Sequence, residues 1–278
     1  MTEIACIQMA SGPNVHANLQ EAARLISRAA DAGAKCVVLP EHFAQMGMKE
    51  TDKLATMETP GSGPIQNFLA ETAKRHDIWV VGGAIPIKSN DNKRCRSRAL
   101  LYNNAGDVVA HYDKIHLFDV QLPEANERYN ESETIEPGED VVVADTPFGK
   151  MGLCVCYDIR FPEMFRLQLD MGMEILAVPS AFTAFTGKAH WRPLIVTRAI
   201  ENQCFVVASA QGGYHVNGRE THGHSMIVDP WGNILDVLPS GSGFVIANID
   251  LAKLESTRKN FPAIQHRRLS CDITTRMK

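Results

Sequence analysis

Short runs of continuous hydrophobic residues alternate along the chain with stretches in which hydrophobic residues recur at helical spacing. Residues 4–10 form the first run, and residues 19–30 carry the first helical pattern, between a capping Asn18 and a terminating Gly33. A second run, residues 35–43, is apolar almost throughout, as expected for a strand that is covered on both faces of its sheet. The pattern therefore predicts an α/β fold.

The same alternation continues toward the end of the chain. Residues 98–114 predict a hairpin that turns at residues 103–106, whereas residues 118–140 have no periodicity and predict a long irregular loop. A helix is expected over residues 186–203, with Pro193 in its first turn. The other expected elements are helices beginning at Pro64 and covering residues 165–172, and strands at residues 78–86, 141–156, 174–182, 204–213, 224–230, 233–239 and 243–250.

Part of this pattern occurs twice. The repeat predicts an α/β fold built as a four-layer α-β-β-α sandwich with an internal pseudo-twofold repeat, in a single domain over residues 1–278 that ends in a tail at about residues 269–278. The two repeats differ where Glu41 aligns with Ser180, so only the first repeat has an acidic residue at the end of this strand. The matched pairs are Gly33 and Pro40 with Gly172 and Pro179 at an offset of 139, and residues 76–83 and 105–106 with residues 202–209 and 231–232 at an offset of 126.

Charge and composition narrow the class of protein. The chain has 45% hydrophobic and 22% charged residues, and its net charge of −4 gives no basic surface for nucleic acid or a membrane. The first residues lack the pattern of a signal peptide, and no stretch approaches the roughly 18 apolar residues of a membrane span. Seven cysteines without a CxxC pair indicate reduced thiols and no zinc cluster. We therefore expect a cytoplasmic protein with a small-molecule or protein partner.

Residues 151–163 read MGLCVCYDIRFPE and predict a strand, a tight turn and a helix. A cysteine at the end of such a strand can expose its sulfur, and Cys156 is therefore the candidate nucleophile. The backbone N–H of Tyr157 is a candidate donor to an oxyanion. Cys154 is expected on the same face, one pleat deeper. Both cysteines could instead be small core residues, since free cysteine usually is, and a catalytic thiol would need a nearby base.

Three other residues have the chemistry that such a thiol needs. Glu41 follows an apolar strand and could act as general acid and base, and Lys114 could stabilise an oxyanion. Glu131 lies in the predicted loop. Each could also be an ordinary solvated charge, so the hypothesis of acyl transfer to sulfur depends on finding the three together.

Four segments resemble a known family. They are PEHF at Glu41, YDKIHLFDV at Lys114, ESETIEPG at Glu131 and GLCVCYDIRFPE at Cys156, and they are similar to the signature segments of the nitrilase superfamily of carbon-nitrogen hydrolases. The resemblance runs in order over residues 4–268. It implies an α-β-β-α sandwich, a Glu41-Lys114-Cys156 triad and a supporting Glu131. It also implies no cofactor, no metal, and assembly into a homodimer or a higher homo-oligomer.

The later segments are similar to the branch of this superfamily that hydrolyses deaminated glutathione, releasing 2-oxoglutarate and cysteinylglycine. Such an acidic substrate needs a cation and polar donors, so we expect a pocket wall formed by Arg160, Thr186, His190 and Trp191. Arg160 could instead pair with a structural carboxylate, and Trp191 could belong to the helix core. Residues 119–130 do not match the eukaryotic members of the branch closely, and they border the expected pocket.

Other functions remain open at this stage. An ω-amidase or nitrilase would use the same triad on a small amide or nitrile and release ammonia, and a non-catalytic interaction module would use none of it. Three histidines, His215, His222 and His224, lie close together in sequence. No carboxylate or cysteine stands beside them at ligand spacing, so the sequence does not favour a metal site.

Overall fold

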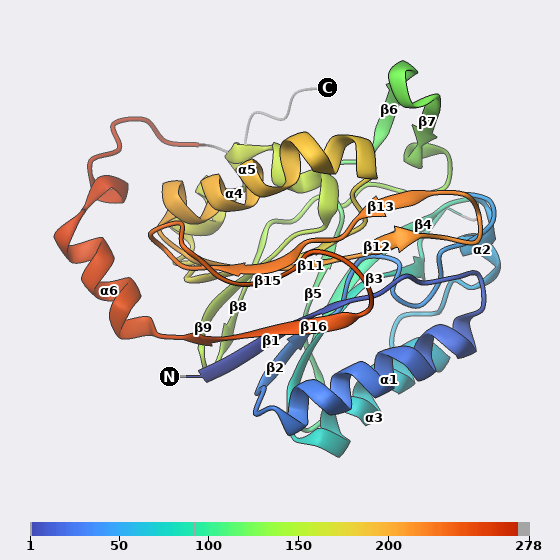
Figure 1. The fold of residues 1–278 in the computed structure, drawn as a ribbon, viewed down its shortest axis with the longest axis horizontal. Coiled ribbons are helices and arrows are strands. Elements are labelled where there is room, and N and C mark those ends of the chain that lie inside the picture. Colours follow the sequence, from blue (N-terminus) through green and yellow to red (C-terminus); the bar gives the residue numbers. More distant parts are fainter. Residues whose placement is uncertain (1, 92, 272–278) are drawn as a thin grey trace.

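Two six-stranded mixed sheets lie face to face in this computed structural model, which describes residues 2–91 and 93–271 (Figure 1). The first sheet has the order β16-β1-β2-β3-β4-β5, and the second has the order β15-β14-β11-β10-β9-β8. The strands of the first are β1 (Thr2–Gln8), β2 (Cys36–Val38), β3 (Trp79–Lys88), β4 (Cys95–Tyr102), β5 (Val108–Asp113) and β16 (Gly243–Ile249). Those of the second are β8 (Val142–Thr146), β9 (Gly149–Leu153), β10 (Ile175–Ser180), β11 (Phe205–Ala210), β14 (Ser225–Val228) and β15 (Ile234–Leu238).

Helices cover the outer faces of both sheets, which confirms the expected four-layer sandwich (Figure 1). Two of them, α1 (Val15–Asp31) and α3 (Pro64–His76), lie on the first sheet, and α4 (Pro162–Asp170) and α5 (Ala184–Asn202) lie on the second. The shorter helices are α2 (Asp52–Ala55), α6 (Leu251–Asn260), and the 3-10 turns η1 (Pro123–Ala125), η2 (Glu131–Glu133), η3 (Cys156–Arg160) and η4 (Ala263–Gln265).

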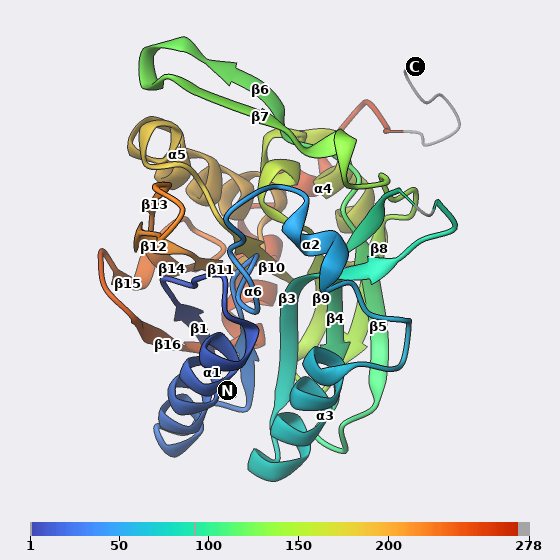
Figure 2. The ribbon, with the colours of Figure 1, turned by 90° about the vertical axis from the view of Figure 1, so that its right-hand side faces the viewer.

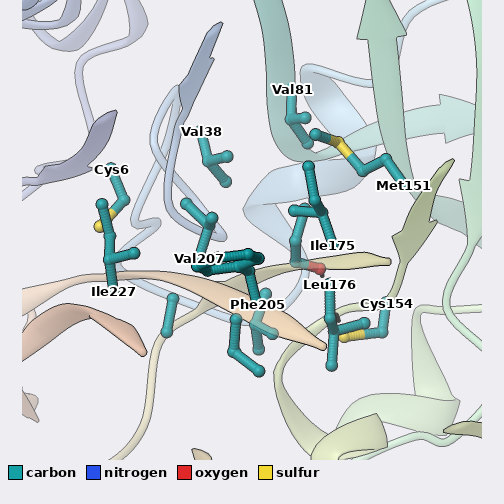
Figure 3. Close-up of a cluster of buried hydrophobic side chains, with 14 of the residues drawn as sticks. Cys6, Val38, Val81, Met151, Cys154, Ile175, Leu176, Phe205, Val207 and Ile227 are labelled. Atoms are coloured by element: carbon teal, nitrogen blue, oxygen red, sulfur yellow. Dashed lines mark hydrogen bonds between the residues drawn. The ribbon is translucent and has the colours of Figure 1, made fainter. Parts of the chain in front are cut away.

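The hydrophobic core fills the space between the layers. Along β1, Ile4 and Cys6 belong to the cluster between the two sheets, whereas Ala5 and Ile7 belong to the cluster under α1 and α3. Because both faces of β1 are covered, its sequence is apolar without alternation. The cluster between the sheets includes Cys6, Val38, Val81, Met151, Cys154, Ile175, Phe205, Val207 and Ile227 (Figure 3).

The predicted repeat is present in the strand pairing. Counted from β16 or from β8, each sheet has one antiparallel pair, two parallel pairs and two antiparallel pairs in the same order. The matched glycines also share a backbone conformation, with φ of 101° at Gly33 and 92° at Gly172. The first sheet takes its edge strand from a distant part of the chain, since β16 follows the second repeat and pairs with β1 of the first, whereas the matching edge strand of the second sheet, β8, directly precedes its partner β9.

Three sequence-based predictions of local structure were wrong. The first helix begins at Val15 and is capped by Asn14, so Asn18, the predicted cap, is a buried residue inside the helix. The expected irregular loop contains a projecting hairpin of β6 (Asp119–Leu122) and β7 (Glu127–Asn130) (Figure 2). Its residues are exposed or half-buried and none belongs to the core, so the segment lacks the hydrophobic alternation that marks a strand. Pro193 lies in the middle of α5 and not in its first turn, because the helix already begins at Ala184, capped by Thr183. A second small hairpin joins β12 (Gly212–Tyr214) to β13 (Glu220–His222).

The ends of the chain add two points. Most of the expected tail, from residue 272 onward, lies outside the described residues. Within the described part of the chain, each helix is too short or too polar to cross a membrane.

Candidate active site

Cys156 sits at a sharp turn just beyond β9, the strand next to the edge strand β8 of the second sheet. Its φ of 48° is in the left-handed region, which a residue with a side chain rarely adopts, and its thiol is only partly buried. The fully buried Asp158 holds the turn by accepting hydrogen bonds from Val155 N at 2.8 Å, His116 N at 3.0 Å and the Tyr112 hydroxyl at 2.8 Å. The turn therefore presents the sulfur in a fixed position, as a nucleophile elbow does.

Cys154, two residues earlier, has a different environment. Strand β9 ends at Leu153, so both cysteines lie beyond it, but Cys154 has no exposed surface and its Sγ donates to the Ala177 carbonyl oxygen at 3.4 Å. Burial raises the pKa of this thiol well above its ordinary value, and the charge of Asp158 adds to the effect. Cys154 is thus a packed core residue that a reagent cannot easily reach.

The three charged residues predicted from the sequence meet beside Cys156. Glu41 lies three residues beyond the end of β2, and Lys114 directly follows β5. Glu131 is the first residue of η2. Lys114 Nζ donates to Glu41 Oε1 at 2.9 Å and to Glu131 Oε1 at 2.9 Å. All three side chains are at least nine-tenths buried, so this is an ion triad shielded from water.

The charges of the site are coupled through Lys114. Burial acts to lower the pKa of Lys114, but Glu131 and Glu41 outweigh it and raise that pKa well above its usual range. Burial acts to raise the pKa of Glu41, but the charge of Lys114 and the hydrogen bonds from Lys114 and Cys156 lower it to about 2. Glu41 is therefore an ionised carboxylate, in hydrogen-bond contact with Cys156.

The thiol itself is protonated in the resting site. Burial and the negative charge of Glu41 raise the pKa of Cys156 well above its ordinary value, against the opposing effects of Lys114 and of the Ala181 N–H, which donates to the sulfur. A protonated thiol beside an ionised carboxylate is the arrangement that a general base requires before it accepts a proton.

Gln211 also supports the site, and the sequence analysis did not identify it. Its fully buried amide Nε2 donates to the Glu41 carbonyl oxygen at 3.1 Å and to Ser11 Oγ at 2.9 Å. Gln211 follows β11 as Glu41 follows β2, so its place at the end of an apolar strand was the signal that could have found it. Through these bonds it joins the second sheet to the turn that carries Glu41.

A pocket of about 500 Å³ opens onto Cys156 and the ion triad. Arg160 and Thr186 line it, as expected from the sequence, and so does Tyr157. His190 and Trp191 do not belong to the lining. The pocket is lined as well by residues that the sequence analysis did not name: His42, Glu50, Lys53, Phe118, Tyr129, Asn130, Ala181, Phe182, Thr183 and Arg219.

The four residues expected in the pocket wall thus divide into two pairs. Arg160 lies over the ring of Phe182 at 5.0 Å, and its Nη1 is 3.1 Å from His190 Nδ1. His190 therefore contacts Arg160 without lining the pocket itself. Trp191 is fully buried, packs on Phe182, and donates from Nε1 to the His224 carbonyl oxygen at 2.8 Å. Trp191 therefore occupies the helix core, the alternative that the sequence had left open.

Comparison with known proteins agrees with this geometry. The family model described as carbon-nitrogen hydrolase matches residues 3–259. A deaminated glutathione amidase of Synechocystis is 43% identical over 95% of this chain and 97% of its own length. A deaminated glutathione amidase of Yersinia enterocolitica is 38% identical over 99% of this chain and 96% of its own length.

Solved structures share the fold. The crystal structure of Nit3 from Saccharomyces cerevisiae, a member of branch 10 of the nitrilase superfamily, superposes with a TM-score of 0.86 at 32% identity, covering 96% of this chain and 97% of that chain. With the family model extending over most of the sequence, the conclusion is direct: this chain belongs to the carbon-nitrogen hydrolase family.

Proposed function

We propose that the protein is a cysteine-dependent amidase that cleaves a carbon-nitrogen amide bond through a thioester on Cys156. The observation that carries this proposal is the position of Lys114 Nζ, 2.9 Å from carboxylate oxygens of both Glu41 and Glu131, at the pocket that holds the partly exposed thiol. A base, a cation and a nucleophile at one pocket are the parts that acyl transfer requires.

In the first half-reaction, Glu41 accepts the proton of Cys156 and the sulfur attacks the amide carbon. The carbonyl oxygen becomes an oxyanion, which Lys114 and the Tyr157 N–H stabilise. Lys114 is also the cation that keeps the pKa of Glu41 low. As the oxyanion takes up part of that positive charge, Glu41 becomes a stronger base at the moment when it must hold the proton.

The second part returns the site to its starting state. The carbon-nitrogen bond breaks as Glu41 gives its proton to the leaving amine, and the acyl group remains on the sulfur as a thioester. Glu41 then takes a proton from water, whose oxygen attacks the thioester carbon. The carbon-sulfur bond then breaks, Glu41 returns the proton to the departing sulfur, and the carboxylic acid is released, so the net reaction consumes one water and needs no cofactor.

The substrate that we propose is deaminated glutathione, hydrolysed to 2-oxoglutarate and cysteinylglycine. Two relatives that the chain matches over nearly their full length carry this activity in their names. The pocket adds a physical reason, because Arg160 on its wall can bind a carboxylate and Thr186 can donate a hydrogen bond.

Hydrolysis of a substrate panel tests the proposal. Deaminated glutathione, 2-oxoglutaramate, glutamine and a simple nitrile are compared with the wild type and with Cys156→Ala. Turnover of deaminated glutathione that the variant lacks is the expected result. Preference for 2-oxoglutaramate or for the nitrile would assign an ω-amidase or a nitrilase instead, and folded protein without any turnover would favour a non-catalytic interaction module.

An exposed apolar patch and the unpaired cysteines support proposals about the oligomeric state of the protein and its cellular location. Ile200, Trp231 and Phe261 are each at least half exposed and form an apolar patch beside α5, with Trp231 and Phe261 in ring contact. We propose that this patch lies in a homodimer interface, and Trp231→Glu should then yield monomers in sedimentation experiments. Unpaired cysteines throughout the chain support a reducing, cytoplasmic location, which cell fractionation would test.

A further inference from the structure

The pocket has a second group of charged residues, which also lines an adjoining cavity that Arg160 does not reach. An adjoining cavity of about 290 Å³ shares four lining residues with the main pocket, His42, Glu50, Lys53 and Arg219. Cys156 and Arg160 line the main pocket but not this extension. The site therefore has cations of two kinds: Arg160 lines the main pocket alone, whereas Lys53 and Arg219 line the main pocket and its extension.

Arg219 is held rigidly but keeps donor capacity. Its backbone N–H donates to Asn217 Oδ1 at 3.0 Å, and Asn217 Nδ2 in turn donates to the Gly47 carbonyl oxygen at 2.7 Å. The guanidinium lies over the Tyr129 ring at 4.9 Å. Its buried Nε has no hydrogen-bond partner within the described residues, and Glu50 Oε1 is 3.9 Å from Nη1, beyond hydrogen-bond distance.

The charges of this group leave one positive charge in excess. Lys53 Nζ and Glu50 Oε2 form an ion pair at 2.8 Å, so they neutralise each other. His42 adds no charge at neutral pH, because burial, together with Lys53 and Arg219, lowers its pKa to about 4. Glu50 thus faces two cations, Lys53 at 2.8 Å and Arg219 at 3.9 Å, and the group keeps a net charge of one positive unit at the pocket wall, where an anionic ligand gains from it.

The role of Glu41 as proton donor to the leaving nitrogen indicates which part of a substrate lies near this group of charged residues. Glu41 has to deliver its proton to the leaving nitrogen, and His42 is the next residue along the chain. The leaving amine therefore lies on the Glu41 side, toward His42 and Arg219, while the acyl chain extends toward Arg160. This step rests on the amidase function proposed above.

We propose that Arg219, with Lys53, binds a carboxylate carried by the leaving amine. The preferred substrates are then amides whose amine is an amino acid or a short peptide with a free C-terminus. An amide that releases ammonia leaves this subsite unused.

Three substrates with the same acyl group test the assignment: deaminated glutathione, its C-terminal carboxamide, and 2-oxoglutaramate. For Arg219→Gln, kcat/KM on deaminated glutathione should fall by about tenfold or more, since a charge-assisted hydrogen bond is lost. The same variant should change kcat/KM on the other two substrates by less than about threefold. Lys53→Met should show the same selectivity to a smaller degree, and the control Arg24→Gln, on the exposed face of α1, should leave all three unchanged.

A binding measurement separates this proposal from the amidase proposal. In a Cys156→Ala background, calorimetry compares deaminated glutathione with its C-terminal carboxamide, with and without Arg219→Gln. Tighter binding of the carboxylate form that disappears with Arg219→Gln supports the subsite, whatever the turnover. Equal binding of the two forms, or an equal loss on all three substrates, overturns it, whereas wild-type protein without turnover overturns only the amidase proposal.

Discussion

The two repeats of this protein have the same strands and helices but carry opposite chemistry. Beyond β2 the chain reads Pro40-Glu41, and at the equivalent place, the last two residues of β10, it reads Pro179-Ser180. Lys114 follows β5, and the residue 126 positions later, after β15, is Ser240. The first repeat thus provides the base and the cation, and the second provides small hydroxyl residues at the same positions.

The nucleophile shows the reverse assignment. Cys156 lies between β9 and α4 of the second repeat, whereas the first repeat has the turn between β1 and α1 at that place. Two similar repeats therefore form one asymmetric site, because the first provides the base and the cation and the second provides the nucleophile. Substitutions at equivalent positions of the two repeats test this difference.

The largest effect is expected at the nucleophile. Cys156→Ala should lower kcat/KM by at least about 10⁴-fold, since the variant cannot form the thioester. Cys154→Ala is the matched control and should leave kcat/KM within about threefold while lowering the free energy of unfolding by about 1–2 kcal/mol, because it creates a small cavity. Steady-state kinetics and urea denaturation measure both, and an equal loss of activity in the two variants would contradict the assignment.

Lys114→Met tests the ion triad through stability. The substitution leaves Glu41 and Glu131 buried without their shared cation, so the free energy of unfolding should fall by about 3–5 kcal/mol. Ser240→Ala, at the equivalent position of the other repeat, is exposed and should change it by less than about 0.5 kcal/mol. If urea denaturation gave similar values for the two variants, the triad would not be the stabilising element that its geometry indicates.

Acid should weaken the protein through the same triad. The pKa of Glu41 is about 2 in the folded protein and ordinary, near 4.5, in the unfolded chain, so the unfolded chain binds the extra proton. The stabilisation from Glu41 is present above about pH 4.5 and is lost as the pH falls toward 2. Urea denaturation across this window should show a shallower pH dependence for Glu41→Gln than for the wild type, and an unchanged slope would argue against an ionised Glu41.

A small effect of opposite sign is expected at Ser180, the counterpart of Glu41. Its hydroxyl is buried and has no hydrogen-bond partner among the described residues. Ser180→Ala should therefore raise the free energy of unfolding slightly, by up to about 1 kcal/mol, because the folded state no longer buries an unpaired polar group. A decrease of more than about 1 kcal/mol in thermal or urea denaturation would show that this hydroxyl has a partner after all.

Local sequence signals predicted much of the fold and the centre of the site. The apolar runs located the strands, and the polar residues after them, Glu41, Lys114 and Cys156, are brought to one pocket. Arg219 was not predicted, because it approaches the pocket only through the small β12–β13 hairpin and the contact of Asn217 with Gly47. Trp191 was expected at the pocket wall, but a helix places adjacent residues on different faces, and spacing in sequence does not say which face is buried.

The position of β16 has a consequence for the growing chain. Strand β1 is synthesised more than 200 residues before its partner β16, so the outer edge of β1 stays unpaired until residue 249 has left the ribosome. An exposed apolar edge strand invites pairing with other chains. A chain truncated before β16 is expected to aggregate, because the edge of β1 is covered only when β16 has been synthesised and pairs with it.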